Sequence, residues 1–136
     1  MKNIAFIGTS HIHTPNFISK VNSNNQINCN GVWDKDKNRS KSDSEKLKCK
    51  NYDDYIDLLK ERNLDGVIVC SETNLHYELV KKITENKKHC FIEKPLGIGK
   101  KDSLEMANLI ESSKIIFQTG YFMRSNPVYR KLKELI

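Results

Sequence analysis

Short apolar runs alternate with polar, helix-forming segments along the whole of this 136-residue chain. The first run, Asn3–Ile7, and the clearest one, Val67–Cys70, are nearly continuous in apolar residues. Strands of this kind are buried on both faces, as in a parallel sheet. Parallel neighbours need right-handed helical crossovers. The alternation therefore predicts a doubly wound parallel six-stranded sheet, the Rossmann fold, in a three-layer α/β/α arrangement.

The residue pattern also predicts where each element lies. The expected strands are Asn3–Ile7, Ile27–Trp33, Leu47–Lys50, Val67–Cys70, Lys88–Ile92 and Lys114–Gln118. The expected helices are Pro15–Val21, Lys35–Lys46, one from Asp54 to about Arg62, Leu75–Glu85, Lys100–Ser113 with Leu104, Ala107, Leu109 and Ile110 inward, and one opening at Pro127. We expect the strand order 3-2-1-4-5-6, with turns at Gly8, Asp34, Ser71 and Glu93 converging on one edge.

Length and charge exclude several classes of protein. The chain is one ordinary domain, too short for a (β/α)₈ barrel of roughly 200 residues or more. The net charge of +6 makes nucleic-acid binding a function to consider. However, the lysines are mixed with acidic residues, and no basic run carries aromatic stacking platforms. We expect no nucleic-acid partner and, because no stretch approaches a membrane span, no membrane partner.

The four cysteines, Cys29, Cys49, Cys70 and Cys90, follow one another at intervals of 20, 21 and 20 residues, which matches a strand-plus-helix repeat. No C-x-x-C pair suggests a metal or redox site. We interpret them as small apolar residues in or beside successive strands. Unpaired cysteines favour a reducing compartment, so we expect a soluble, unexported, cytoplasmic protein.

A glycine turn and a helix start follow the first strand directly. Gly8 breaks the apolar run, and Thr14-Pro15 is typical of an N-cap with proline at the first helical position. In a parallel sheet, backbone N–H groups and a helix N-terminus at such a turn hold anions, which makes a nucleotide phosphate the expected ligand. The dinucleotide fingerprint G-x-G-x-x-G/A keeps only Gly8, because Ser10 and His13 occupy its other two small-residue positions.

Asp34 closes the second strand, a little over twenty residues beyond the glycine turn. A dinucleotide-binding fold uses an acidic residue here to bond the adenosine ribose hydroxyls. An N-cap for the helix that follows is the other interpretation. The first interpretation predicts a preference for NAD over NADP, because a carboxylate repels a 2′-phosphate, although Lys35, Lys37 and Arg39 soften that repulsion.

The segment Glu93–Leu96, directly after the fifth strand, resembles the E-K-P motif of the Gfo/Idh/MocA oxidoreductases, the family of glucose-fructose oxidoreductase and inositol dehydrogenase. Three further segments resemble the family in the same order. They are Asp65–Val69, like its fourth strand; Ser71–His76, like its T-P-N-x-x-H turn with Glu72 for the proline; and Gly120–Pro127, like its sixth strand and exit. The likeness extends over essentially the whole chain.

The resemblance implies that residues 1–136 are an NAD(P)-binding domain of an oxidoreductase, with NAD as the cofactor and NADP as the alternative. The implied reaction is hydride transfer to or from a hydroxyl-bearing carbon of a sugar, polyol or related small molecule. Lys94 is the expected catalytic residue, beside the nicotinamide, and the Lys94-Pro95 bond is expected to be cis. The expected cofactor contacts are Gly8, Thr9, Ser10, His11, Ile12, Asp34, Ser71, Thr73, His76, Glu93 and Lys94.

Two other interpretations stay open. Family members continue into a C-terminal substrate domain that these 136 residues lack, so the alternative is a stand-alone nucleotide-binding or sensing module without catalysis. A homo-oligomer is compatible with a chain that has such a domain. The rival class is a metal hydrolase, because His11-x-His13 resembles the metal-binding H-x-H of amidohydrolases. That class needs further ligands on later barrel strands, so we expect no metal.

Overall fold

The computed structural model describes residues 1–136 and contains one six-stranded sheet in which every pair is parallel. The strand order is β3-β2-β1-β4-β5-β6, with the first strand in the middle. The predicted fold class and the predicted strand order are both confirmed.

The strands are β1 (Lys2–Ile7), β2 (Ile27–Trp33), β3 (Lys50–Asn51), β4 (Gly66–Val69), β5 (His89–Ile92) and β6 (Phe117–Thr119). The helices are α1 (Thr14–Asn22), α2 (Lys37–Leu47), α3 (Tyr55–Leu59), α4 (His76–Glu85), α5 (Gly99–Ser113) and α6 (Pro127–Glu134), with short 3₁₀ segments η1 (Thr73–Leu75) and η2 (Phe122–Ser125). None of the helices combines the length and the apolar character that a membrane crossing needs.

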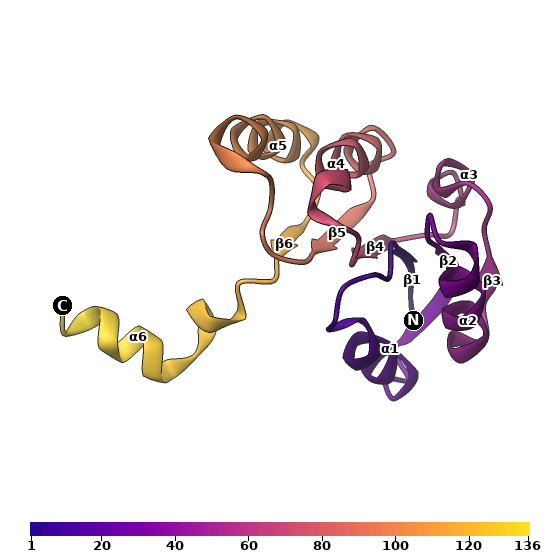
Figure 1. Ribbon diagram of the computed structural model, residues 1–136, viewed down its shortest axis with the longest axis horizontal. Coiled ribbons are helices and arrows are strands. Elements are labelled where there is room, and N and C mark those ends of the chain that lie inside the picture. The colour runs from indigo at the N-terminus through magenta and orange to yellow at the C-terminus, as the bar shows by residue number, and fades with distance from the viewer.

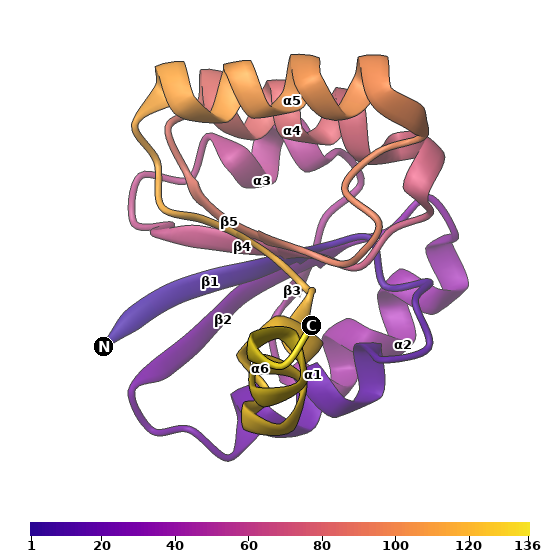
Figure 2. The ribbon, with the colours of Figure 1, turned by 90° about the vertical axis from the view of Figure 1, so that its left-hand side faces the viewer.

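Helices cover both faces of the sheet. Figure 2 shows α3, α4 and α5 on one side and α1 and α2 on the other. Side chains of β1 alternate between two cores, because Ala5 and Ile7 pack into the first layer and Phe6 packs into the second. A strand with apolar partners on both sides needs apolar residues at every position, which explains the continuous run at the N-terminus.

Three predicted elements differ from the observed ones. The sixth strand was expected at Lys114–Gln118 but spans Phe117–Thr119, because Lys114 ends α5 in a left-handed conformation. The third strand was expected at Leu47–Lys50, but Leu47 is buried as the last residue of α2, and Lys48 ends that helix in a left-handed conformation (φ 52°). Pairing with β2 therefore starts only at Lys50. Helix α3 ends at Leu59 rather than near Arg62, because Leu58 and Leu59 already complete its buried face.

The inner face of α5 was also predicted wrongly in part. Met106 is fully buried and Ile110 packs on the same core, whereas Leu104 is 53 % exposed and Ala107 is exposed as well. Residues four positions apart share a helix face, and a residue two positions away points to nearly the opposite side. Anchoring through Met106 thus turns Leu104 outward.

The C-terminal segment extends away from the sheet. Figure 1 shows η2 and α6 projecting beyond the body of the domain, and Val128, Leu132 and Leu135 are exposed there. Asn126 caps α6 by accepting a hydrogen bond from the backbone N–H of Val128 at 2.9 Å. The largest hollow of the surface, about 860 Å³, lies along these two elements and contains none of the expected site residues.

All four cysteines are free and lie in or beside strands, as predicted. Cys70 and Cys90 are buried, and burial raises the pKa of the Cys70 thiol to about 12. Cys29 and Cys49 are partly exposed, with their sulfur atoms 3.6 Å apart. A hydrogen bond from the Cys49 thiol lowers the pKa of Cys29. Cys29 therefore differs from the buried thiols in both access and pKa, whereas Cys49, whose pKa is raised by the same contact, differs from them only in access.

We expect this difference to appear in thiol labelling of the native domain. A charged aromatic disulfide reagent should modify Cys29 first and Cys49 next, whereas Cys70 and Cys90 should react only after unfolding, since the thiolate is the reactive form. Mass spectrometry of time points with and without denaturant measures this. In the Cys29→Ser control the fast phase should disappear. Equal rates at all four thiols would contradict the observed packing.

Candidate functional site

Polar side chains from several strands meet at the carboxyl edge of the sheet. Ile7 pairs with Trp33 of β2 and with Val69 of β4, and Val69 pairs with Ile92 of β5. The residues that follow these strand ends lie along one edge, namely Gly8, Asp34, Ser71 and Glu93. The predicted convergence of the four turns follows directly from this register. Ligands of open parallel sheets bind at this edge.

Gly8 allows the first turn to lie directly against the end of β4. Its φ is +76°, and a Cβ at this position would overlap the Cα and Cβ of Ser71. The carbonyl of Gly8 accepts a hydrogen bond from the N–H of Cys70 at 3.2 Å, and the N–H of His11 donates to the carbonyl of Cys70 at 2.9 Å. Two backbone bonds therefore fix the turn to its neighbour.

The same turn leaves several polar groups without a protein partner. The N–H groups of Ser10 and Ile12 donate to no protein acceptor, and Thr14 Oγ1 is buried without a hydrogen bond. Thr14 is the first residue of α1, and the N-cap is His13, whose side chain does not cap the helix, so the predicted Thr14 cap is wrong. Free N–H groups beside a helix N-terminus suit an anion such as a diphosphate.

A cleft of about 260 Å³ opens beside this turn. Its lining comes from the turn, from the first residues of α1 and from α2: Thr9, His11, Ile12, Thr14, Pro15, Arg39, Ser42, Asp43 and Lys46. Two basic side chains in this set, on Arg39 and Lys46, favour an anionic ligand, and Lys46 is also paired with Asp43 of the same lining at 2.7 Å. The residues present therefore fit the phosphates of a nucleotide.

Asp34 is 1 % exposed, and both of its carboxylate oxygens are occupied. Its Oδ2 accepts from the N–H and hydroxyl of Thr9 and from Nε of Arg39, at 2.6, 3.1 and 3.0 Å. Its Oδ1 accepts from the N–H of Asp36 and from Nη2 of Arg39, both at 2.8 Å. Burial alone would raise the pKa of Asp34, but these bonds outweigh it and hold the pKa below its ordinary value. The cap of α2 is Asp36 instead.

Arg39 lies between two carboxylates from different turns. Besides its two bonds to Asp34, its Nη2 lies 3.7 Å from Oε1 of Glu72, which Lys35 also reaches at 3.0 Å. The guanidinium of Arg39 thus covers the buried carboxylate of Asp34. Arg39 appeared in the sequence only as a nearby charge, and its position five residues after Asp34 was the available signal for this pair.

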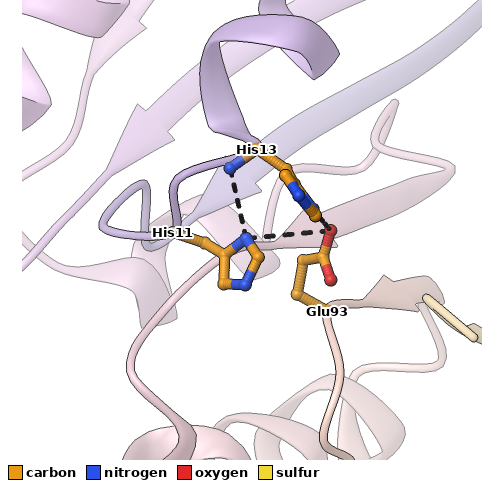
Figure 3. Close-up of side chains that lie close together, drawn as sticks. All are labelled: His11, His13 and Glu93. Atoms are coloured by element: carbon orange, nitrogen blue, oxygen red, sulfur yellow. Dashed lines mark hydrogen bonds and ion pairs between the residues drawn. The ribbon is translucent and has the colours of Figure 1, made fainter.

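Glu93 follows β5 and is 3 % exposed. Its Oε2 accepts from the N–H of Lys94 at 3.0 Å, and its Oε1 lies 3.1 Å from Nδ1 of His13 and 3.8 Å from Nδ1 of His11. Figure 3 shows the two imidazole rings and the carboxylate turned toward one another. Gly120 provides the space, since a Cβ there would lie 2.9 Å from Oε2 of Glu93.

Lys94 is half-buried, and its bond to Pro95 is cis, as the E-K-P resemblance implied. Its Nζ lies 3.4 Å from Nε2 of His11. Burial lowers the pKa of His11, Glu93 acts in the opposite direction, and the positive charge of Lys94 reinforces the lowering. Nδ1 of His11 accepts a hydrogen bond from the backbone N–H of His13 at 3.3 Å, so in the neutral ring the proton lies on Nε2, the atom that faces Lys94.

His76 anchors the loop after β5 rather than facing the cleft. It is 1 % exposed, and its Nδ1 lies 3.0 and 3.1 Å from the carbonyls of Pro95 and Leu96. Ser71 is buried beside the Gly8 turn, and Thr73 begins η1 with a partly exposed side chain. Direct contact of these three residues with a cofactor stays a prediction.

A model of the GFO_IDH_MocA family, described as an oxidoreductase family with an NAD-binding Rossmann fold, matches residues 2–121. The chain belongs to this family. Its resemblance to Gfo/Idh/MocA oxidoreductases, predicted from the E-K-P motif, is thereby confirmed.

Relatives of the Gfo/Idh/MocA domain include inositol dehydrogenases. The myo-inositol 2-dehydrogenase of Thermotoga maritima is 39 % identical over 87 residues, which cover 64 % of this chain and 26 % of the relative. The inositol 2-dehydrogenase/D-chiro-inositol 3-dehydrogenase of Lactiplantibacillus plantarum is 29 % identical over 98 % of this chain and 37 % of the relative. This chain thus spans about a quarter to two fifths of these relatives.

A solved structure supports the same assignment. The crystal structure of a probable dehydrogenase from Thermotoga maritima superimposes on this chain with a TM-score of 0.84 at 32 % sequence identity. The match covers 97 % of this chain and 40 % of that one.

The contact between Gly8 and Ser71 yields a stability prediction. Gly8→Ala should lower the free energy of unfolding by about 3 kcal/mol, because a left-handed strain of about 1–2 kcal/mol adds to the cost of displacing backbone. Gly99→Ala is the matched control, because Gly99 also has a positive φ (+81°) but no atom within 4 Å. It should cost only the strain. Urea unfolding of both variants measures the difference, and equal losses would show that the Ser71 contact carries no weight.

Proposed function

We propose that this domain binds NAD(P) for hydride transfer to or from a hydroxyl-bearing carbon of a sugar, polyol or related small molecule. The observation that carries the proposal is the meeting of the Gly8 turn, the Asp34–Arg39 pair and Lys94 along one sheet edge, in a chain of an oxidoreductase family. The names of the inositol dehydrogenases among its relatives support a polyol as the substrate class.

Each part of the edge has a separate task in cofactor binding. The free N–H groups of Ser10 and Ile12 would hold the diphosphate at the N-terminus of α1. Arg39 and Asp34 would meet the adenosine ribose on the α2 side. Bound there, the nicotinamide supplies the hydride acceptor or donor. Lys94 would lie at the nicotinamide end, by resemblance to the family.

Lys94 is the residue that would act on the substrate oxygen. The Lys94 ammonium donates a hydrogen bond to the substrate oxygen and stabilises the negative charge that develops as the alcohol loses its proton. Nε2 of His11 lies 3.4 Å from Lys94 Nζ, so the imidazole limits where the lysine side chain can lie. The N–H of Lys94 bonds to Glu93, which holds the lysine backbone in place.

Cofactor preference depends on Arg39 in this proposal. The expected preference for NAD assumed a free Asp34 carboxylate, but Arg39 neutralises that carboxylate and presents its own guanidinium to the cleft. Arg39 would therefore attract a 2′-phosphate, while Asp34 would repel it. We propose a modest preference for NAD, set by the balance of these two side chains.

A cytoplasmic location and the assembly state belong to the same proposal. Four free cysteines support a reducing compartment. A homo-oligomer would form through a C-terminal domain of the kind that the longer relatives carry. The non-catalytic sensing module would use the same cofactor site, so only turnover separates it from an enzyme.

The role of Arg39 can be tested by calorimetric titration with NAD and NADP. Arg39→Gln keeps a donor for Asp34 but removes the charge, so NADP affinity should fall at least about tenfold, the scale of one charge-assisted hydrogen bond. NAD affinity should change much less. Lys41→Gln, at an exposed lysine on α2, should change neither the NAD affinity nor the NADP affinity. If Arg39→Gln lowered the affinities for NAD and NADP equally, Arg39 would have no part in choosing between the two cofactors.

The role of Lys94 can be tested in a chain continued by a C-terminal substrate domain. Lys94→Ala should lower turnover at least roughly a hundredfold, the usual effect of a positioned acid-base group. NAD affinity should stay within about tenfold of the parent. Lys100→Ala, an exposed lysine nearby, is the control and should leave turnover unchanged. Near-normal turnover in Lys94→Ala would show that another residue has the catalytic role. Residues 1–136 alone should bind the cofactor but oxidise no sugar.

A further inference from the structure

His11, His13 and Glu93 bring three metal-ligating groups together from two distant parts of the chain. The two histidines lie in the turn before α1, and Glu93 follows β5. One potential ligand atom from each residue lies within 4.8 Å of the other two. Figure 3 shows that all three side chains point into the same small volume. The fold thus brings the carboxylate of Glu93 next to the H-x-H motif, although it lies 80 residues further along the chain than His13.

The two distances to Glu93 suit a zinc-sized cation, and all three ligand atoms lie within 4.8 Å of one another. Bonds of about 2.0–2.2 Å in a tetrahedral site place neighbouring ligand atoms roughly 3.3–3.5 Å apart. Oε1 of Glu93 lies 3.1 Å from Nδ1 of His13 and 3.8 Å from Nδ1 of His11. Small rotations of the two rings, which are not tightly buried, would equalise these distances. Two imidazole nitrogens and one carboxylate oxygen form a donor set that Zn²⁺ and its first-row neighbours accept.

The charge balance points the same way. Glu93 is 3 % exposed, and only the two imidazoles face its Oε1. The nearest lysine ammonium, on Lys94, is directed at Nε2 of His11 instead of at the carboxylate. A buried carboxylate is costly without a positive partner, and a divalent cation would supply that charge.

We propose that His11, His13 and Glu93 bind a divalent cation of the zinc class through Nδ1, Nδ1 and Oε1. The side chain of His13 is 39 % exposed, so a fourth position is open toward solvent and takes water in the isolated domain. Metal on Nδ1 of His11 would replace the hydrogen bond that this atom accepts from the backbone N–H of His13 at 3.3 Å, and it would keep the ring proton on Nε2. This inference does not rest on the proposed reaction, because metal binding needs neither cofactor nor substrate.

Titration of the chelator-treated domain with Co²⁺ tests the site directly. One equivalent should bind and give visible d–d bands of a nitrogen- and oxygen-ligated ion, without sulfur-to-cobalt charge transfer. Zn²⁺ added afterwards should bleach these bands. Cys29→Ser should behave like the parent, which would exclude the Cys29–Cys49 pair as the source of the ligands. His89→Asn, on an exposed histidine outside the cluster, is the second control.

The ligand variants decide the outcome. His13→Asn and the isosteric Glu93→Gln should each weaken Co²⁺ binding at least about tenfold, the lower end of what even supporting residues of a metal site cost. Circular dichroism confirms that each variant is folded, and two chemically different variants guard against one failing to fold. Absence of d–d bands in the parent, or an affinity for Co²⁺ in both variants equal to that of the parent, would overturn the proposal and leave the cluster as a hydrogen-bonded support for Glu93. NAD titration, run separately, would report on the proposed function alone.

Discussion

The close contact between the Gly8 turn and the end of β4 is the constraint on which the rest of this site depends. Without a side chain at Gly8, and with its positive φ, the turn lies on Ser71 and forms backbone bonds to Cys70. This contact determines where α1 begins and where the side chains before it point. His11 and His13 can meet Glu93 only because the first turn lies so close to its neighbours.

Two carboxylates at the strand ends are buried, and each needs partners that compensate its charge. Asp34 and Glu93 are almost completely removed from solvent, and an unpaired charge there would be strongly destabilising. Asp34 accepts five hydrogen bonds, two of them from the Arg39 guanidinium, whereas Glu93 has backbone N–H and imidazole partners. The two carboxylates thus differ in their partners. Both oxygens of Asp34 accept hydrogen bonds from backbone, hydroxyl and guanidinium groups, whereas Oε1 of Glu93 faces two imidazoles.

Sequence reasoning succeeded where a property is local or follows from topology. Six apolar runs with helical segments between them predicted the observed sheet order through right-handed crossovers, and the family motifs predicted which residues lie at the carboxyl edge. It failed at boundaries that packing decides. Leu47 belongs to α2 because its side chain fills the core, and Leu104 faces solvent because Met106 anchors α5. Helical periodicity alone does not choose between two adjacent apolar faces.

The amino-acid sequence by itself determined the fold, the family and the set of residues at the strand ends, because apolar periodicity and ordered motifs are read directly along the chain. Only the tertiary structure decided which of those residues meet. Arg39 closes over Asp34, and His13 reaches Glu93 eighty positions away, because parallel strands bring their carboxyl ends to one edge. Side-chain partnership across that edge depends on distances of a few ångströms, and a linear sequence contains no such distances.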